Sequence, residues 1–372
     1  MDNNNYYYYG GYGYQPAPPM IPVKPLKPKL SAAGRKQVRK HYNRTMLLYF
    51  LMSLVFILYR IFSPQAYIMA IGISLTANAK YSTAVEYIMN NTALYRFLSI
   101  LFVLMLEAMT VIIGSHFLKI DIPALFRPTK RTISMTLSSF SVSTAISMAA
   151  ASAFAVILYL LSSFGNAELP ESAFDTTPVS VGSTAWVLYV IYGCLLGPIF
   201  EELVFRGIFY KALSKYNRLT GIIFSSLLFA LFHGNLQQFF YTFLGGIVFC
   251  YMLDYSGSIF PSILTHMICN TFNILIKESI IDIVSLPLPE IIDFEAYGIS
   301  TPTYGMLISG ALSLLVAAAG VVILIVLLAK KRIFPPKRSL PAKLSGLPML
   351  LSSPLFYIGI SIFAVETVIT LY

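Results

Sequence analysis

Long apolar segments dominate this chain and constrain its fold more than any other feature. A helix needs about 20 apolar residues to cross the ~30 Å hydrocarbon core of a bilayer. The chain of 372 residues is 57% hydrophobic and only 11% charged, with a mean hydropathy of +0.72. These values lie far outside the range of ordinary soluble domains. They predict an all-α protein, a polytopic transmembrane helical bundle.

Nine apolar segments are long enough, or nearly long enough, to span the membrane. The fifth and sixth are short and are separated only by His233–Leu236, so we expect roughly 8–9 spans. The segments are 46–62, 97–118, 133–163, 185–210, 219–233, 237–254, 259–276, 305–329 and 348–371.

Composition divides the chain into five regions. The first 30 residues are rich in Tyr, Gly and Pro and offer no periodic apolar face, which predicts disorder. The expected regions are 1–45, a disordered and then basic cytosolic tail; 46–163, N-terminal membrane helices; 185–275, core helices; 278–304, an extracytoplasmic loop; and 305–372, C-terminal membrane helices.

Basic residues gather in alternate loops, and cytoplasmic flanks of membrane helices collect lysine and arginine. Residues 24–44 contain eight of them and no acid, whereas the loops on the opposite side carry acids and almost no bases. We therefore expect a multi-pass protein of the cell membrane with a cytoplasmic N-terminus. The net charge of +10 favours anionic lipids as partners and not nucleic acid, because the bases flank apolar runs. The three cysteines lie inside apolar segments without a metal or disulfide spacing.

The densest group of ionisable residues within an apolar segment is the run F-E-E-L-V-F-R-G at 200–207. Charged side chains inside a membrane are costly, so each one suggests a function. At about 100° per residue, Glu202 and Arg206 share one face of a helix, whereas Glu201 points well away from Arg206. We expect Glu202 to pair with Arg206 and Glu201 to project into a cavity inside the membrane as a general base.

Two further polar motifs lie in later apolar segments. F-A-L-F-H ends at His233, and H-M-I-C-N places His266 and Asn270 four residues apart, on one helical face. Two such donors could bind a developing oxyanion. A lone histidine in an apolar helix is more often a packing residue than a catalyst, but this combination favours a site.

The three motifs, in this order and spacing, resemble those of the CAAX-processing and bacteriocin-processing (CPBP) membrane protease family. That family includes the Ras-converting CAAX protease and the lysostaphin-resistance-A-like and abortive-infection-like bacterial proteins. The resemblance covers about residues 185–275. It implies an intramembrane endopeptidase acting on a membrane-embedded or membrane-associated peptide or protein.

The resemblance also implies roles for individual residues. Glu201 and His233 would activate a water molecule, Glu202 and Arg206 match the other polar positions of the first motif, and His266 with Asn270 would stabilise the oxyanion. No motif position is substituted, which argues against a degenerate, non-proteolytic relative.

Zinc is the alternative way to activate water, because two histidines and a carboxylate can bind it. The H-E-x-x-H signature of zinc peptidases is absent, and Asn270 suits an oxyanion better than zinc. We therefore expect a glutamate mechanism without a cofactor, with zinc as the second choice.

Other polar residues in the apolar segments have simpler explanations. Glu107 and Glu366 are lone acids that match no motif and suggest neutral, hydrogen-bonded helix contacts or interfacial positions. Asn273 lies three residues after Asn270 and suggests either an extension of the polar face or a helix-packing hydrogen bond.

Two other classes of function compete with the enzyme. A protein of the same fold could act as a non-proteolytic membrane scaffold or immunity-type protein. A transporter is disfavoured because the chain lacks an internal repeat and a continuous path of charges.

Overall fold

The computed structural model describes residues 31–76, 92–165, 182–234, 236–278, 303–330, 350–358 and 360–361. Every element assigned within these ranges is a helix, as expected for an all-α bundle. The elements are α1 (Ala32–Thr76), α3 (Thr92–Leu118), η1 (Pro123–Leu125), α4 (Thr132–Gly165), α5 (Thr184–Ile191), η2 (Tyr192–Leu196), α6 (Gly197–Glu202), η3 (Leu203–Tyr210), α7 (Lys211–Ser214), α8 (Arg218–Phe232), α9 (Leu236–Ser256), α10 (Phe260–Asn270), η4 (Thr271–Glu278) and α12 (Tyr304–Ala329).

Within the described residues, six helical stretches are long and apolar enough to cross a membrane. The protein is therefore a multi-pass membrane protein, as the composition predicts. The stretches are Ala32–Phe62, Ala93–Leu118, Thr132–Phe154, Thr184–Ser214, Gln238–Ser256 and Tyr304–Ala329.

Two other expected spans differ from single long helices. The segment at 219–233 forms α8, which has 15 residues. The segment at 259–276 forms α10, of 11 residues, followed by the π-helical η4. Of the expected span 348–371, the structure describes only residues 350–358 and 360–361, so this span stays a prediction.

Helix α1 begins earlier than the predicted span at residue 46. Its basic first part is helical from Ala32, and Val38, Tyr42 and Met46 are buried at four-residue spacing. The basic side chains around them are exposed, so this stretch is an amphipathic helix that packs on the bundle. Residues 1–30, the predicted disordered tail, and most of the predicted loop at 278–304 lie outside the described residues.

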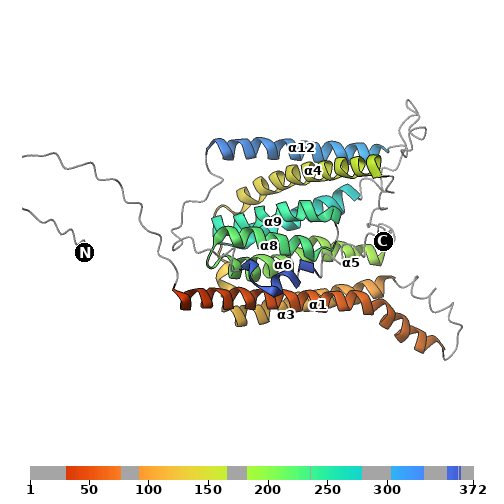
Figure 1. The fold of residues 1–372 in the computed structure, drawn as a ribbon. Helices are drawn as coiled ribbons and strands as arrows, with labels where there is room; N and C mark the ends of the chain where they lie inside the picture. The colour runs from red at the N-terminus through yellow and green to blue at the C-terminus, as the bar shows by residue number, and fades with distance from the viewer. Residues whose placement is uncertain are drawn as a thin grey trace, which may run out of the picture.

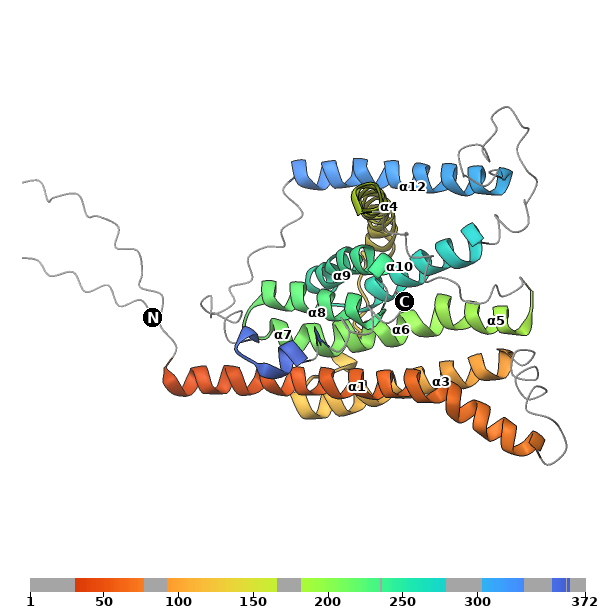
Figure 2. The same cartoon turned by 45° about the vertical axis from the view of Figure 1, so that its right-hand side comes forward.

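Figures 1 and 2 show how the helices surround the core. Helices α12 and α4 pack together on one side, and α1 and α3 pack together on the opposite side. The elements from α5 to α10 lie between these two pairs, with α9 and α10 against α4, and η3 against α3. This arrangement places the three polar motifs inside the bundle.

A glycine controls the contact between α4 and α12. A Cβ atom at Gly320 would overlap the backbone oxygen of Ser141, whereas one at Gly310, on the same helix, would meet nothing within 4 Å. Small residues of this kind let membrane helices approach closely.

We expect Gly320→Ala to destabilise the protein by about 1–3 kcal/mol, because α12 must move away from α4. Gly310→Ala is the matched control and should leave stability unchanged or slightly higher, since alanine favours a helix. Thermal unfolding of both variants in detergent checks the prediction. Equal unfolding temperatures for the two variants would contradict the close contact.

Candidate active site

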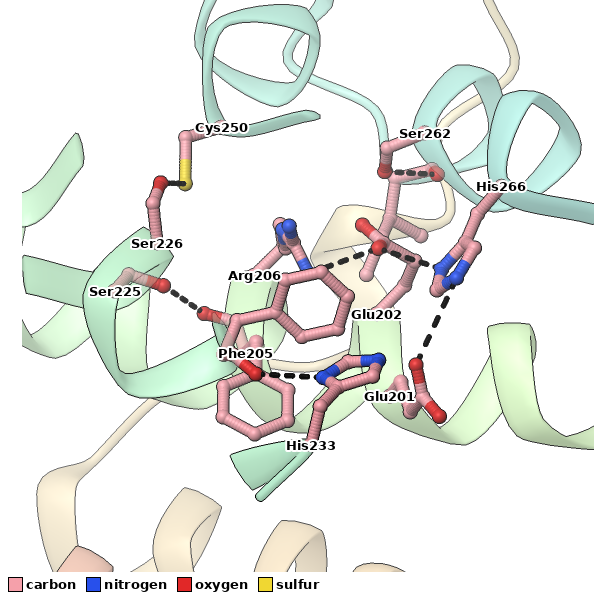
Figure 3. Close-up of polar contacts among 12 residues, drawn as sticks. Glu201, Glu202, Phe205, Arg206, Ser225, Ser226, His233, Cys250, Ser262 and His266 are labelled. Carbon is pink, nitrogen blue, oxygen red and sulfur yellow. Dashed lines mark hydrogen bonds and ion pairs between the residues drawn. The ribbon is translucent and has the colours of Figure 1, made fainter. Parts of the chain in front are cut away.

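The three polar motifs meet at one place inside the bundle (Figure 3). Glu201 and Glu202 end α6, His233 follows the last residue of α8, and His266 lies on α10. Helix α6 is flanked by the π-helical segments η2 and η3. Such segments are rare and often occur at functional sites, because the wider turn changes the direction of neighbouring side chains.

Glu202 and Arg206 form the expected ion pair. Arg206 Nη1 lies 2.9 Å from Glu202 Oε1, and both side chains have no exposed surface. The guanidinium carbon also lies 4.2 Å from the ring centre of Phe229 and 5.0 Å from that of Phe249. A buried cation is therefore stabilised by one carboxylate and two aromatic faces.

His266 contacts both glutamates. Its Nδ1 lies 3.2 Å from Glu202 Oε1, and its Nε2 lies 3.7 Å from Glu201 Oε2 (Figure 3). Adjacent residues on a helix point in directions about 100° apart, and the imidazole fits between them with one nitrogen toward each. The predicted separation of Glu201 from the Glu202–Arg206 pair is thus incomplete, because His266 links them.

Asn270 lies four residues after His266 on α10 but has a partner of its own. Its Nδ2 donates a hydrogen bond of 2.8 Å to the backbone oxygen of Gly193, in η2. An asparagine amide has two N–H donors, so one remains for another acceptor. Asn270 therefore ties α10 to the π-helical turn before α6.

His233 has a defined orientation at the end of α8. Its Nδ1 lies 2.9 Å from the backbone oxygen of Phe229, and its ring packs edge-on against the Phe229 ring at 4.8 Å. A carbonyl oxygen only accepts, so Nδ1 carries the proton and Nε2 of the neutral ring has a free lone pair. Figure 3 shows this second nitrogen on the side of Glu201.

Two carboxylate oxygens of the site have unused acceptor capacity. Glu201 Oε2 and Glu202 Oε2 are buried and accept no hydrogen bond from the described residues. Buried polar atoms are nearly always paired, so such oxygens indicate a place for a polar ligand. A water molecule or a peptide bond has the donors that they require.

The side chains do not converge as zinc ligands would. Within the described residues, no group of three His, Cys, Asp or Glu side chains could hold a metal ion. The two nitrogens of His266 face different carboxylates, and Nδ1 of His233 faces a carbonyl. This ligand arrangement does not fit a tetrahedral zinc site.

Residues without a motif complete the surroundings. Phe229 contacts Arg206, His233 and His266 and is 2% exposed, so it forms the apolar wall between them. Glu107 is buried and interacts electrostatically with Glu201. The sequence could not predict this interaction, because Glu107 lies far from the three motifs in the chain.

The remaining polar residues named above lie apart from this cluster or outside the described structure. Asn273 is exposed, and its Nδ2 donates to the backbone oxygen of Cys269, 2.9 Å away, which is a local contact four residues back and not the expected hydrogen bond between helices. Glu366 lies outside the described residues.

Comparisons with known proteins match the segment of the chain that contains these residues. Residues 183–272 match the family described as type II CAAX prenyl endopeptidase Rce1-like. The Bacillus subtilis (strain 168) protein named "Putative membrane peptidase YdiL" is 30% identical over 91 residues, which cover 24% of this chain and 37% of that protein. No solved structure matches the chain. This multi-pass membrane protein therefore contains, at residues 183–272, a segment that is similar to the Rce1-like CAAX prenyl endopeptidases.

Proposed function

We propose that this protein is an intramembrane endopeptidase that hydrolyses a peptide bond of a membrane-associated protein or peptide. The observation that carries the proposal is the meeting of Glu201, His233 and His266 beside a buried Glu201 oxygen that accepts no hydrogen bond from the described residues. The Rce1-like match of the same segment supports it.

In the proposed reaction, Glu201 and Nε2 of His233 hold a water molecule between them. Glu201 accepts a proton from the water as the water oxygen attacks the carbonyl carbon of the substrate. The proton then passes to the leaving amine as the C–N bond breaks. General base catalysis of this kind contributes about 10²–10⁴-fold to the rate.

The oxyanion of the tetrahedral intermediate accepts hydrogen bonds from His266 and from the second N–H of Asn270. Glu202 orients His266 through Nδ1, at 3.2 Å, and leaves Nε2 toward the reacting centre. A donor at Nε2 requires the doubly protonated ring. Arg206 in turn holds Glu202, so the pair positions the histidine.

The same proposal includes the setting of the enzyme. The N-terminus lies in the cytoplasm, the substrate reaches the site from the membrane, and anionic lipids contact the basic ends of the helices. Prenylated CAAX peptides are one candidate substrate class, because the matched family is named for them.

Cleavage of a peptide library by the purified protein in lipid nanodiscs tests the proposal. The library contains prenylated CAAX peptides, their unprenylated forms and unrelated apolar peptides, and mass spectrometry identifies the products. We expect cleavage by the wild type and by Asp121→Asn, a control for carboxylate-to-amide exchange in an exposed loop, and none by Glu201→Gln. If no peptide is cleaved, and Glu201→Gln and His233→Ala both keep the biological effect, the protein is a scaffold.

The proposed mechanism needs no metal, so we expect activity to survive treatment with chelators. The measurement compares the cleavage rate before and after incubation with EDTA or a stronger zinc chelator, followed by dialysis. Inactivation that added zinc reverses would show that a metal activates the water.

A further inference from the structure

Glu107, in the second half of α3, is an unusual residue in this bundle. Its side chain has no exposed surface, and neither carboxylate oxygen has a hydrogen-bond partner among the described residues. A buried ionised carboxylate without a partner is strongly unfavourable in an apolar interior. Glu107 therefore remains neutral, or it has a partner that the proposed reaction supplies.

The electrostatic surroundings of Glu107 point to the candidate active site. Its charged neighbour is Glu201, and Tyr192 of η2 interacts with both carboxyl groups. Neither oxygen of Glu107 accepts a hydrogen bond from a lysine, arginine or histidine of the described residues. Helix α3 packs against α5, α6 and η3, so the backbone brings Glu107 to the helix that carries Glu201.

Two carboxyl groups that interact in one buried site do not both ionise without a large cost, so the pair retains a proton. Glu201 has His266 Nε2 at 3.7 Å, and His233 is also in electrostatic contact with it. Glu107 has no such partner among the described residues. Burial without a hydrogen-bond partner therefore keeps the proton on Glu107.

We propose that Glu107 is a positioning residue of the active site: a neutral carboxyl that donates a hydrogen bond, through one water molecule, to the Glu201 carboxylate. This inference rests on the proposed peptidase function for its kinetic consequence. The donated bond holds one oxygen of Glu201 and leaves the other for the attacking water. Glu107 keeps its own proton through the cycle, while the proton of the water passes through Glu201 to the leaving amine.

Two substitutions separate this role from simple packing. Glutamine resembles a neutral glutamic acid and can donate through its amide, so we expect Glu107→Gln to keep kcat within a few-fold of the wild type. Leucine has similar size and no donor. We expect Glu107→Leu to lower kcat by about 10–100-fold, the loss of one hydrogen bond to a charged group, with KM nearly unchanged.

For the leucine variant, we expect stability to change in the opposite direction from activity, and thermal unfolding measures the stability. Replacing a buried carboxyl by an apolar side chain of similar size removes the cost of desolvating the carboxyl, so Glu107→Leu should unfold at a higher temperature than the wild type while it turns over more slowly. A residue that only supports the fold would lose stability and activity together, and that result would overturn the proposal. Equal loss of kcat in the glutamine and leucine variants would also overturn it.

Infrared difference spectroscopy tests the protonation without any peptidase assay. The wild type should show a carboxylic acid C=O band near neutral pH that shifts in D₂O and is missing in Glu107→Gln. Asp121→Asn should keep the band. Absence of the band from the wild type overturns the inference even if peptides are cleaved. Presence of the band in a protein that cleaves nothing supports the neutral Glu107 and refutes the peptidase function.

Discussion

Glu201→Gln is expected to lower the rate of peptide hydrolysis by about 10²–10⁴-fold, the usual contribution of a general base. An amide has nearly the shape of a carboxylate but cannot take the proton of the attacking water. The His266 contact at 3.7 Å is long, so its loss costs little stability. The measurement is the single-turnover cleavage rate of the best peptide from the library, at saturating enzyme.

The fold of this variant is checked by its unfolding temperature, which should stay close to that of the wild type. His233→Gln keeps a polar side chain at the end of α8 and should fall in the same range of activity, since it removes the free ring nitrogen. Near wild-type cleavage by Glu201→Gln would contradict the assignment of the base. Another group would then have to act as the general base.

Arg206→Met is expected to destabilise the protein by about 3–5 kcal/mol, the cost of removing one partner of a buried ion pair. The substitution leaves Glu202 buried without its cation and removes the guanidinium between Phe229 and Phe249. Glu202 and His266 then lose their orientation, so activity falls because the site is disordered and not because a reacting group is missing. Reversible unfolding in detergent mixtures measures the change.

A second ion pair of the same protein provides the control. Arg218 and Asp254 pair at side chains that are 30% and 23% exposed, so Arg218→Met should cost no more than about 1 kcal/mol. The double variant Glu202→Gln with Arg206→Met removes both buried charges and should recover part of the lost stability. Equal destabilisation by Arg206→Met and Arg218→Met would show that burial adds nothing to the first pair.

In the proposed reaction, the polar residues form two groups: those that contact the reacting water and those that act through another side chain. Glu201 and His233 face the reacting water, whereas Arg206 acts through Glu202 and Glu202 acts through His266. Variants of the first pair should lose turnover with the fold intact. Variants of the second should lose stability and turnover together, so the two measurements distinguish the roles.

The sequence by itself determined the features that depend on residues close together in the chain. Lengths of apolar sequence predict membrane helices, and four-residue spacing predicts that Glu202 meets Arg206, because both follow from the geometry of one helix. The number and bounds of the spans were less certain. Short segments such as α8 are buried by neighbouring helices. Helix α1 begins at Ala32, before the apolar segment, because its first part has an apolar face that packs on the bundle.

Only the tertiary structure decided which distant residues meet. His266 lies between two glutamates that are 64 and 65 residues away in the chain, Asn270 bonds to Gly193, and Glu107 reaches Glu201 from another helix. These contacts depend on how α3, α6 and α10 pack and on the π-helical turns around α6, which local periodicity does not encode. The run of two glutamates and an arginine was visible in the sequence, but its link to His266 and Glu107 results from the packing of the bundle.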